Sequence, residues 1–203
     1  MSIQAEIQRR TKILTDIAPF GIFYALHFRF ALPLMHFQTY PAAWTDRYTE
    51  QAYALRDPII AWGFSETGST RWSEIAIPDP FDILGQAREF DMNFGLAVSC
   101  GPIKSRTIAA ASRPDREFSD EEIEKFNGVI SDMHDLTRPP DSLTPAQIKA
   151  LQLIANGDRH AAAAAKLNIS ESALKARLAS ARSSLKARTT AEAIQRARNY
   201  RLL

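Results

Sequence analysis

The spacing of apolar residues in the first part of the chain changes repeatedly between a helical and an extended period. Residues 3–18 carry isoleucine and leucine at helical spacings, which predicts an amphipathic helix. Residues 22–30 and 34–39 are rich in aromatic and apolar residues and predict two strands. Residues 95–100 and 106–111 predict two further strands on either side of a Gly-Pro turn.

Helices are predicted on both sides of these strands in the sequence. Pro78-Asp79-Pro80 opens a helix that extends to Phe90. Ser119-Asp120-Glu121-Glu122 is a capping box, in which the first and last side chains satisfy each other's backbone N–H groups, and it starts another helix. Strands flanked by helices in this way predict an α/β sandwich.

From Leu143 onward the pattern contains short helices only. Thr144-Pro145-Ala146-Gln147 is a capping box with proline at the first helical position, and Asn156-Gly157 ends the helix that it starts. Residues 159–167 predict a second helix. A third helix follows a tight turn, and the capping box Thr189–Glu192 begins the last one.

The third of these helices is capped by Ser170 and runs from Glu171 to about Lys186. Its apolar residues recur at helical spacing and form one stripe: Leu174, Leu178, Ala181 and Leu185. Basic residues with small neighbours are expected on the opposite side. A basic helix face is often only solvated, but on the last helix of a helix-turn-helix it favours contact with DNA. The candidate DNA-binding residues are Ser170, Ser172, Lys175, Ala179, Arg182 and Lys186.

A short polar segment with two adjacent prolines, residues 137–142, predicts a semi-rigid linker. The predicted domains are therefore residues 1–136 and residues 143–203. The predicted fold class is α+β, with an N-terminal α/β/α sandwich domain and a C-terminal all-α helix-turn-helix domain.

Charge is divided unevenly along the chain. The net charge of +2, with 45% hydrophobic and 24% charged residues, is typical of a soluble globular protein. Residues 141–203 carry 11 Lys and Arg against 4 Asp and Glu, whereas residues 1–140 carry 14 against 19. A basic module behind an acidic body favours nucleic-acid binding, because neutralised phosphates release counterions.

Composition also restricts location and chemistry. The single cysteine, Cys100, excludes an intramolecular disulfide and a cysteine-rich zinc site. The N-terminus lacks the layout of a signal peptide, and no apolar run approaches the ~18–20 residues that span a bilayer. We therefore expect a cytoplasmic protein without a membrane partner. Nothing near His27 or His36 in the sequence completes a set of metal ligands, so no metal or other cofactor is expected.

The stretch Tyr40–Trp72 combines aromatic side chains with one carboxylate. Trp44 and Tyr48 are four positions apart, so a helix would place both rings on one face. Asp57 precedes Pro58, which disfavours a helical conformation at Asp57 and predicts that this residue caps the next helix. The residues fit either an ordinary aromatic core around a helix cap or an apolar pocket with a few polar groups.

This stretch resembles the autoinducer-binding domain of LuxR-type quorum-sensing regulators. The resembling pattern is Tyr40-Pro41-x-x-Trp44-x-x-x-Tyr48, then Asp57-Pro58, then Trp72. Gly95 stands where that family has a glycine at the start of a strand. The C-terminal module resembles the same family at Leu143-Thr144, Leu151, Gly157, Leu167, Ile169-Ser170 and Leu185. The resemblance implies a non-enzymatic acyl-homoserine lactone receptor that forms a homodimer and regulates transcription by binding double-stranded DNA.

The resemblance also implies roles for individual residues of the first domain. Tyr40, Trp44 and Asp57 would hydrogen-bond the carbonyls and the amide N–H of the lactone. Tyr48 and Trp72 would pack against the lactone and its acyl chain. The other positions implied to contact the ligand are Pro58, Ile59, Ile83, Leu84, Ala87, Met92 and Ala111. The apolar ones are equally suited to be the buried side of a helix.

Several positions depart from the family pattern. Ala111 stands where several members carry a hydroxyl that meets a 3-oxo group, so no preference for 3-oxo chains is expected. Gln147 replaces a usual Glu, and Ala162 and Ala163 replace a usual Glu-Ile pair. At Ala179 some members carry a basic residue that reads a base. These departures predict DNA binding of low sequence specificity.

Three alternatives compete with a lactone-responsive transcription factor. A response regulator shares this type of C-terminal module, but the first 136 residues lack the order of its phosphoacceptor site. An acyl hydrolase would need a nucleophile motif such as Gly-x-Ser-x-Gly, which the sequence lacks. A lactone-binding antiactivator, which acts by pairing with another regulator instead of reading DNA, stays open.

Overall fold

The computed structural model describes the whole chain except for residues 1–2, 30–31, 140–142 and 201. Two compact units are present, Met1–Arg138 and Pro139–Leu203, and each packs around its own core. Part of the predicted linker, residues 140–142, lies outside the described residues. So does Ala31, at the predicted break between the first two strands. Within the described part of the chain, no helix is both long and apolar enough to cross a membrane.

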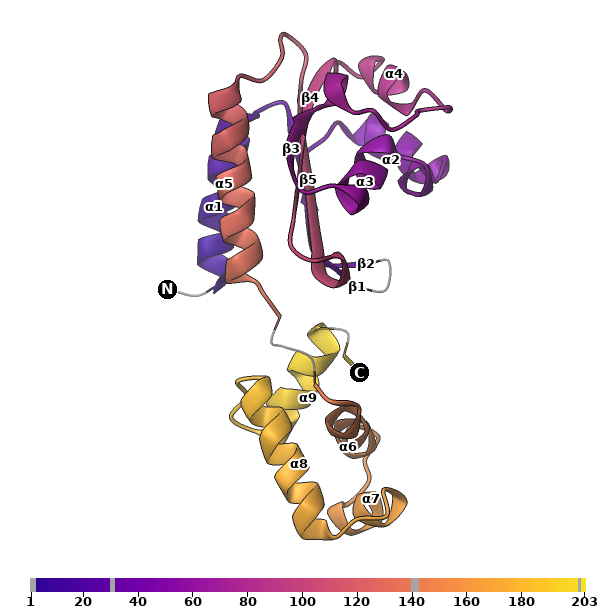
Figure 1. Ribbon diagram of the computed structural model, residues 1–203, viewed down its shortest axis with the longest axis vertical. Coiled ribbons are helices and arrows are strands. Elements are labelled where there is room, and N and C mark those ends of the chain that lie inside the picture. The colour runs from indigo at the N-terminus through magenta and orange to yellow at the C-terminus, as the bar shows by residue number, and fades with distance from the viewer. Residues whose placement is uncertain (1–2, 30–31, 140–142, 201) are drawn as a thin grey trace. The chain divides into compact units, whose positions relative to one another are not determined.

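A five-stranded sheet forms the middle of the first unit (Figure 1). Its strands are β1 (Gly21–Arg29), β2 (Leu32–Gln38), β3 (Gly68–Arg71), β4 (Phe94–Cys100) and β5 (Arg106–Arg113). They pair in the order β2-β1-β5-β4-β3, and every neighbouring pair is antiparallel. Four of the strands lie where the sequence predicts them. The sequence does not predict β3, because its residues Gly-Ser-Thr-Arg show no alternation of apolar and polar side chains.

Helices cover both faces of this sheet, as Figure 1 shows. On one face lie α1 (Ile3–Ile17) and α5 (Asp120–Leu136). On the other face lie α2 (Ala42–Glu50), α3 (Pro58–Ser65) and α4 (Ile83–Arg88). Leu96 and Val98 of β4 belong to the core beneath α1 and α5, whereas Ala97 belongs to the core on the other face. The predicted α/β sandwich is therefore confirmed.

Helix α4 is shorter than the sequence predicts. It begins at Ile83 instead of at Pro78-Asp79-Pro80, and it ends at Arg88 before Phe90. Asp82 has a φ of 51° and is therefore in the left-handed conformation. A right-handed α-helix cannot continue through a residue in this conformation. The segment that precedes α4 is therefore an irregular loop.

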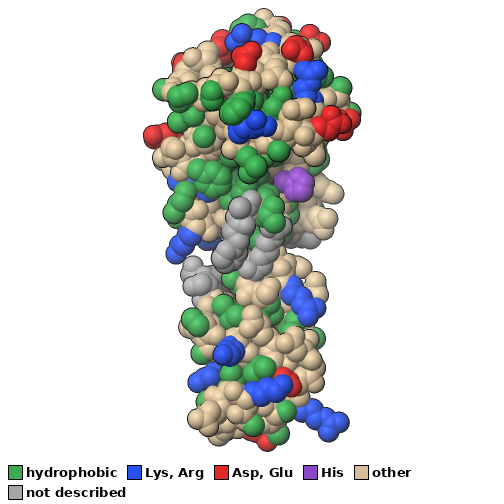
Figure 2. All heavy atoms as spheres, turned by 90° about the vertical axis from the view of Figure 1, so that its right-hand side faces the viewer, with side chains coloured by type: hydrophobic (Ala, Val, Ile, Leu, Met, Phe, Trp, Pro, Cys, Tyr) green, Lys and Arg blue, Asp and Glu red, His purple; other side chains and the backbone are tan. Residues whose placement is uncertain are grey.

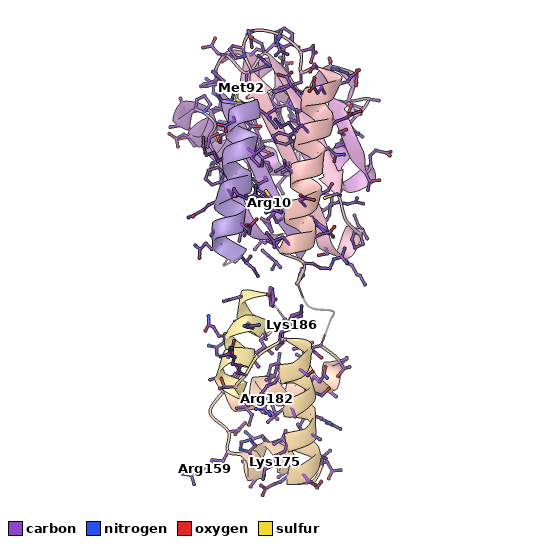
Figure 3. The ribbon with its side chains drawn as sticks, turned by 90° about the vertical axis from the view of Figure 1, so that its left-hand side faces the viewer. Arg10, Met92, Arg159, Lys175, Arg182 and Lys186 are labelled. Atoms are coloured by element: carbon purple, nitrogen blue, oxygen red, sulfur yellow. The ribbon has the colours of Figure 1, made fainter. Side chains whose placement is uncertain are left out.

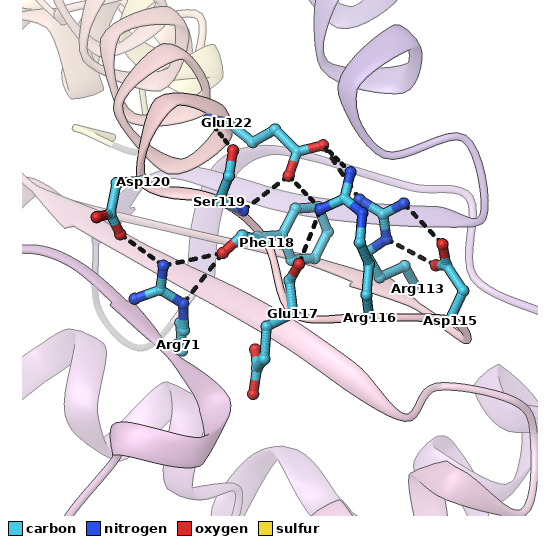
Figure 4. Close-up of polar contacts among 9 residues, drawn as sticks. All are labelled: Arg71, Arg113, Asp115, Arg116, Glu117, Phe118, Ser119, Asp120 and Glu122. Atoms are coloured by element: carbon cyan, nitrogen blue, oxygen red, sulfur yellow. Dashed lines mark hydrogen bonds and ion pairs between the residues drawn. The ribbon is translucent and has the colours of Figure 1, made fainter.

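Arginine side chains join β3 and the segment after β5 to the start of α5 (Figure 4). Arg71 donates to the Phe118 carbonyl over 2.9 and 3.1 Å and to the Asp120 carboxylate over 2.5 Å. Arg116 donates to both carboxylate oxygens of Glu122 over 2.8 Å. These bonds from Arg116 are the main reason that the pKa of Glu122 is lowered to about 2. The short strand β3 is thus held to α5 as well as to β4.

The predicted helix caps are nearly all present. Ser119–Glu122 and Thr144–Gln147 form the capping boxes that start α5 and α6. At the last helix, the Thr189 hydroxyl accepts from the Glu192 N–H over 3.1 Å, as predicted. The Glu192 carboxylate, however, accepts from the Arg188 N–H over 2.8 Å, one residue before the cap. The prediction of a complete capping box is therefore wrong there.

Four helices make up the described part of the second unit: α6 (Pro145–Ala155), α7 (His160–Lys166), α8 (Glu171–Ser184) and α9 (Thr190–Asn199). Their buried core consists of leucine and alanine: Leu143, Ala150, Leu151, Ala163, Ala164, Leu174, Leu178, Ala181, Leu185, Ala193 and Ala197. Helix α8 ends two residues before the predicted Lys186. That residue has a φ of 52° and lies in the turn after the helix.

Candidate functional site

Asp57 lies at the start of α3, and its carboxylate is buried. One carboxylate oxygen accepts a hydrogen bond from the Ile59 N–H over 2.7 Å, so Asp57 is the N-cap that the sequence predicts. The hydroxyl of Tyr48 donates to the other oxygen, also over 2.7 Å. Burial raises the pKa of Asp57, while the hydrogen bonds from Tyr48 and Ile59 oppose this rise. The carboxylate is held in one orientation and keeps lone pairs for a further donor.

Aromatic and aliphatic side chains surround this carboxylate in what we call the α2–α4 cluster. Its buried members are Trp44, Tyr53, Ile59, Trp72, Ile83, Ala87, Met92, Ala97 and Ala110. Trp44 and Tyr48 lie one helical turn apart on α2, with ring centroids separated by 5.7 Å. The centroid of Trp44 also lies 5.9 Å from that of Tyr53 and 5.6 Å from that of Phe90. Rings from three separate segments therefore pack together, and one of them, Tyr48, also bonds Asp57.

The Trp72 indole packs directly over Gly95 and is held there by a hydrogen bond to the backbone. Its indole N–H donates to the Leu96 carbonyl over 3.1 Å. A Cβ atom on Gly95 would stand only 2.1 Å from the Trp72 ring, so no other residue fits at that position without moving the indole. Trp72 can therefore offer a ligand its ring face but not its N–H group.

Three buried polar atoms on this side of the sheet have no hydrogen-bond partner among the described residues: Tyr40 Oη, Asp79 Oδ1 and Ser112 Oγ. Burial, and secondarily Asp57, raises the pKa of Tyr40. A Cβ atom on Gly21 would stand 2.4 Å from Tyr40 Cδ1 and 3.5 Å from Ser112 Oγ, so these two side chains approach the same stretch of β1. Leaving a buried polar atom unpaired costs about 1–3 kcal/mol, which favours a ligand with polar groups here.

Ala111 does not join this site, contrary to the sequence prediction. It belongs to the core beneath α1 and α5, whereas Ala110 belongs to the α2–α4 cluster. Successive side chains of a strand point to opposite faces, so a shift of one residue in the alignment moves a side chain across the sheet. The hydroxyl on the cluster side of β5 is that of Ser112, which the sequence does not single out.

The structure brings the other predicted ligand-binding residues together. In or against the α2–α4 cluster lie Tyr40, Trp44, Tyr48, Ile59, Trp72, Ile83, Leu84, Ala87 and Met92, the last of which is labelled in Figure 3. Asp57 and the buried Pro58 begin α3 beside them. Sequence reasoning misses Tyr53, which lies in a single 3₁₀ turn after α2, where helical spacing from Trp44 gives no signal.

Hydrophobic side chains also reach the surface of the first unit on the side shown in Figure 2. Two of the exposed ones border the cluster in the sequence, namely Leu55 between α2 and α3 and Phe81 before α4. The guanidinium of Arg56 lies 4.4 Å from the centroid of the Phe81 ring. The segments that link α2, α3 and α4 thus present apolar groups to solvent.

The predicted DNA-binding residues lie on α8 or next to its ends (Figure 3). Ser170 is the N-cap of α8, and its hydroxyl lies 2.9 Å from that of Ser172. Lys175 and Ala179 are exposed, and Arg182 is half-buried. Lys186 lies beyond the helix, although its side chain is exposed.

These basic residues are not on the side opposite the buried stripe of α8. Lys175 directly follows the buried Leu174, and Arg182 directly follows the buried Ala181. One residue corresponds to about 100° around an α-helix. The basic positions therefore border the core of the second unit, and this explains the half-buried state of Arg182.

The two histidines that the sequence considers as metal ligands lie in different surroundings. His27 is buried and its ring packs at a tilt of 33° against that of His134, with centroids 4.3 Å apart, whereas His36 is exposed on β2. Among the described residues, no group of three His, Cys, Asp or Glu side chains is arranged to hold a metal ion.

An antiparallel sheet between two helical layers, with a capped and buried aspartate beside aromatic rings on one side, is the architecture of an α/β domain with a candidate small-molecule site. Residues 30–136 match the autoinducer binding domain family, and the chain belongs to that family. The class comprises signal-binding regulators of quorum sensing and is not enzymatic. No curated protein sequence matches the chain.

Solved structures share the fold. Escherichia coli SdiA is 16% identical, with a TM-score of 0.52 over 100% of this chain and 92% of SdiA. A structure of SdiA with octanoyl-rac-glycerol is also 16% identical, with a TM-score of 0.52 over 98% and 88% of the two chains. CepR2 of Burkholderia cenocepacia, an N-acylhomoserine lactone-dependent LuxR-family transcription factor, is 17% identical, with a TM-score of 0.50 over 66% and 82%.

Proposed function

We propose that the first unit binds an acyl-homoserine lactone, or a signal of similar chemistry, within the α2–α4 cluster. The observation that carries this proposal is the buried Asp57 carboxylate, which Tyr48 and the Ile59 N–H orient among aromatic rings. Such a carboxylate accepts the amide N–H of the ligand, and the unpaired hydroxyl of Tyr40 donates to a ligand carbonyl. Trp44 and the neighbouring apolar side chains bury the acyl chain.

We extend the proposal to the rest of the chain. Residues 1–136 form the sensing domain, residues 137–142 the linker and residues 143–203 a helix-turn-helix domain that binds double-stranded DNA. The excess of basic residues in the C-terminal part and the exposed Lys175 on α8 support DNA binding. The likeness in fold to SdiA along the whole chain is consistent with this organisation. In this proposal the protein acts in the cytoplasm. It forms a homodimer, because a two-fold dimer can bind two symmetric DNA half-sites.

A second candidate function is that of an antiactivator, which binds the signal and sequesters another regulator by pairing with it. The observation that favours it is the loss of large side chains in the second unit. Ala163 is buried in the core at a position where the resembled family pattern has isoleucine, and the exposed Ala179 cannot hydrogen-bond a base. Measuring the binding of the ligand-bound protein to random duplex DNA at low salt separates the two functions. The complete absence of binding would favour the antiactivator.

The ligand proposal is tested by calorimetry with N-octanoyl homoserine lactone and the full chain. Asp57→Asn keeps the shape of the side chain but removes its charge, so the affinity is expected to fall by ~1.5–3 kcal/mol, the range for hydrogen bonds to charged groups. Asp46→Asn, at an exposed position of α2, is the matched control and leaves the affinity unchanged. Equal affinity of wild type and Asp57→Asn would contradict the assigned role of Asp57.

A further inference from the structure

A second carboxylate, that of Asp79, is held close to the α2–α4 cluster. Asp79 Oδ2 accepts a hydrogen bond from the Leu84 N–H over 2.8 Å, and the Asp79 carbonyl accepts from the Asp82 N–H over 3.1 Å. These bonds fix the loop before α4. The remaining oxygen, Oδ1, is buried and has no hydrogen-bond partner among the described residues.

Helix α4, which Asp79 precedes, is part of the candidate site. Ile83 and Ala87 of α4 are buried members of the α2–α4 cluster, and Leu84, whose N–H binds Asp79, packs against it. The Tyr53 hydroxyl donates to Gln86 Oε1 over 2.5 Å and so ties α4 to the same group of rings. Burial is the main cause of the raised pKa of Asp57, and the charge of Asp79 adds to it.

A further polar group without a hydrogen-bond partner among the described residues, the hydroxyl of Ser112, lies on the sheet side of the site. Ser112 is fully buried on β5. It lies on the same face as Ala110 of the cluster and near the Tyr40 ring. The site therefore offers two hydroxyls that can donate to ligand oxygens and a second carboxylate oxygen that can only accept.

An unsubstituted acyl-homoserine lactone has a single N–H donor, and the proposed function assigns that donor to Asp57. Asp79 Oδ1 would stay unpaired beside such a ligand, at the desolvation cost of a buried acceptor. We propose that the natural ligand is an acyl compound with a hydroxyl group in addition to the group held by Asp57, and that this hydroxyl donates to Asp79. This inference rests on the proposed function and names the ligand class more closely.

The hydroxyl can belong to the acyl chain or to the head group, and three probes distinguish these sources. N-octanoyl homoserine lactone has no hydroxyl, N-(3-hydroxyoctanoyl) homoserine lactone carries one on the chain, and 1-octanoyl glycerol carries hydroxyls on the head group. Calorimetry on the full chain is expected to show at least one hydroxylated probe binding tenfold or more tightly than the lactone without a hydroxyl. That ratio is typical of a hydrogen bond to a charged group.

The variant Asp79→Asn then tests whether Asp79 is responsible. Its amide oxygen still accepts the Leu84 N–H bond, while an N–H donor replaces the free acceptor. The advantage of the hydroxylated probe is expected to fall below threefold, and the affinity for the lactone without a hydroxyl is expected to change little. Asp82→Asn, at an exposed carboxylate of the same loop, is the matched control and keeps the tenfold preference.

Equal binding of all three probes to the wild-type protein would overturn this inference while leaving the proposed function intact, and that comparison needs no variant. A preference that survives in Asp79→Asn would also overturn it. Failure of every probe to bind would overturn the proposed function together with the inference.

Discussion

The Tyr48 hydroxyl and the Asp57 carboxylate form a 2.7 Å hydrogen bond that joins helix α2 to the first turn of helix α3. Burial raises the pKa of Asp57 because it disfavours the ionised carboxylate, whereas the hydrogen bond from Tyr48 stabilises the ionised form and lowers the pKa. Tyr40, only eight positions before Tyr48 in the sequence, has a buried hydroxyl without a partner among the described residues. Two tyrosines of one site thus differ in whether their hydroxyl is already engaged.

Replacing Tyr48 with Phe is expected to destabilise the protein. The change removes the donor to Asp57 and leaves one oxygen of a buried carboxylate unpaired. The free energy of unfolding should fall by ~1.5–3 kcal/mol, the range for hydrogen bonds to charged groups. Urea denaturation followed by tryptophan fluorescence measures this change.

Tyr40→Phe is the matched comparison and should behave in the opposite way. No hydrogen bond to a described residue is lost, so the unfolding free energy should change by less than ~0.5 kcal/mol or increase slightly. Ligand affinity should fall instead, because the unpaired hydroxyl is reserved for the ligand in our proposal. An equal loss of stability in both variants would contradict the distinction between a Tyr48 hydroxyl that stabilises the fold and a Tyr40 hydroxyl that is free to bind the ligand.

Gly95→Ala is expected to displace the Trp72 indole. The added Cβ would stand 2.1 Å from the Trp72 ring, which neither group can tolerate. Overpacking of this kind costs ~1–3 kcal/mol, and loss of the bond from Trp72 to the Leu96 carbonyl adds ~1 kcal/mol. A changed tryptophan emission spectrum, together with a lower urea midpoint, would report the displacement. Gly128→Ala on α5 is the control, since nothing lies within 4 Å of its added Cβ and alanine favours the helix.

The buried pair His27 and His134 predicts a loss of stability in mild acid. The His134 ring bonds Thr107 Oγ1 over 2.8 Å, and burial lowers its pKa from the ordinary value of 6.5. Among neighbouring charges, Asp135 opposes this shift, while Arg138 and Arg106 reinforce it. The unfolded chain therefore binds a proton at a higher pH than the folded chain does.

The stabilising contribution is complete above about pH 6.5 and is lost as the pH falls below that value toward the lowered pKa of the folded state. Urea unfolding measured between pH 7.5 and 5.0 should show this decline. In His134→Gln the decline should be smaller, whereas His36→Gln, at an exposed position, should follow the wild type. A wild-type unfolding free energy that stays constant over this range would contradict the prediction.

If the second unit binds DNA, Lys175 and Arg182 should contribute differently. Binding to random duplex should weaken steeply with salt, because phosphate contacts release counterions. Lys175→Ala removes an exposed side chain near the start of α8 and should reduce the preference for any one operator by ~1–3 kcal/mol. Arg182→Ala should weaken binding to all sequences alike. Competition binding with operator and random duplex separates the two effects, and a preference above ~10⁴ for one site would contradict the expected low specificity.

Local features of the site could be predicted from the sequence because their causes lie within a few residues. The Asp57-Pro58 pair fixes a helix start through backbone sterics, and the cap is observed. Trp44 and Tyr48 share a face because they are one helical turn apart. The capping boxes of α5 and α6 follow from the same short-range geometry.

Only the tertiary structure decided which side chains of distant segments meet. The pairing of Gly95 with Ser112 and of Leu96 with Ala111 places Ala111 away from the site and Ser112 on the side of the cluster. The hydrogen bond from Tyr53 to Gln86, between residues 33 positions apart in the sequence, likewise ties α4 to the rings of the cluster. Spacing within a segment sets a periodicity, but strand register sets the face that each residue occupies, and register depends on the partner strand.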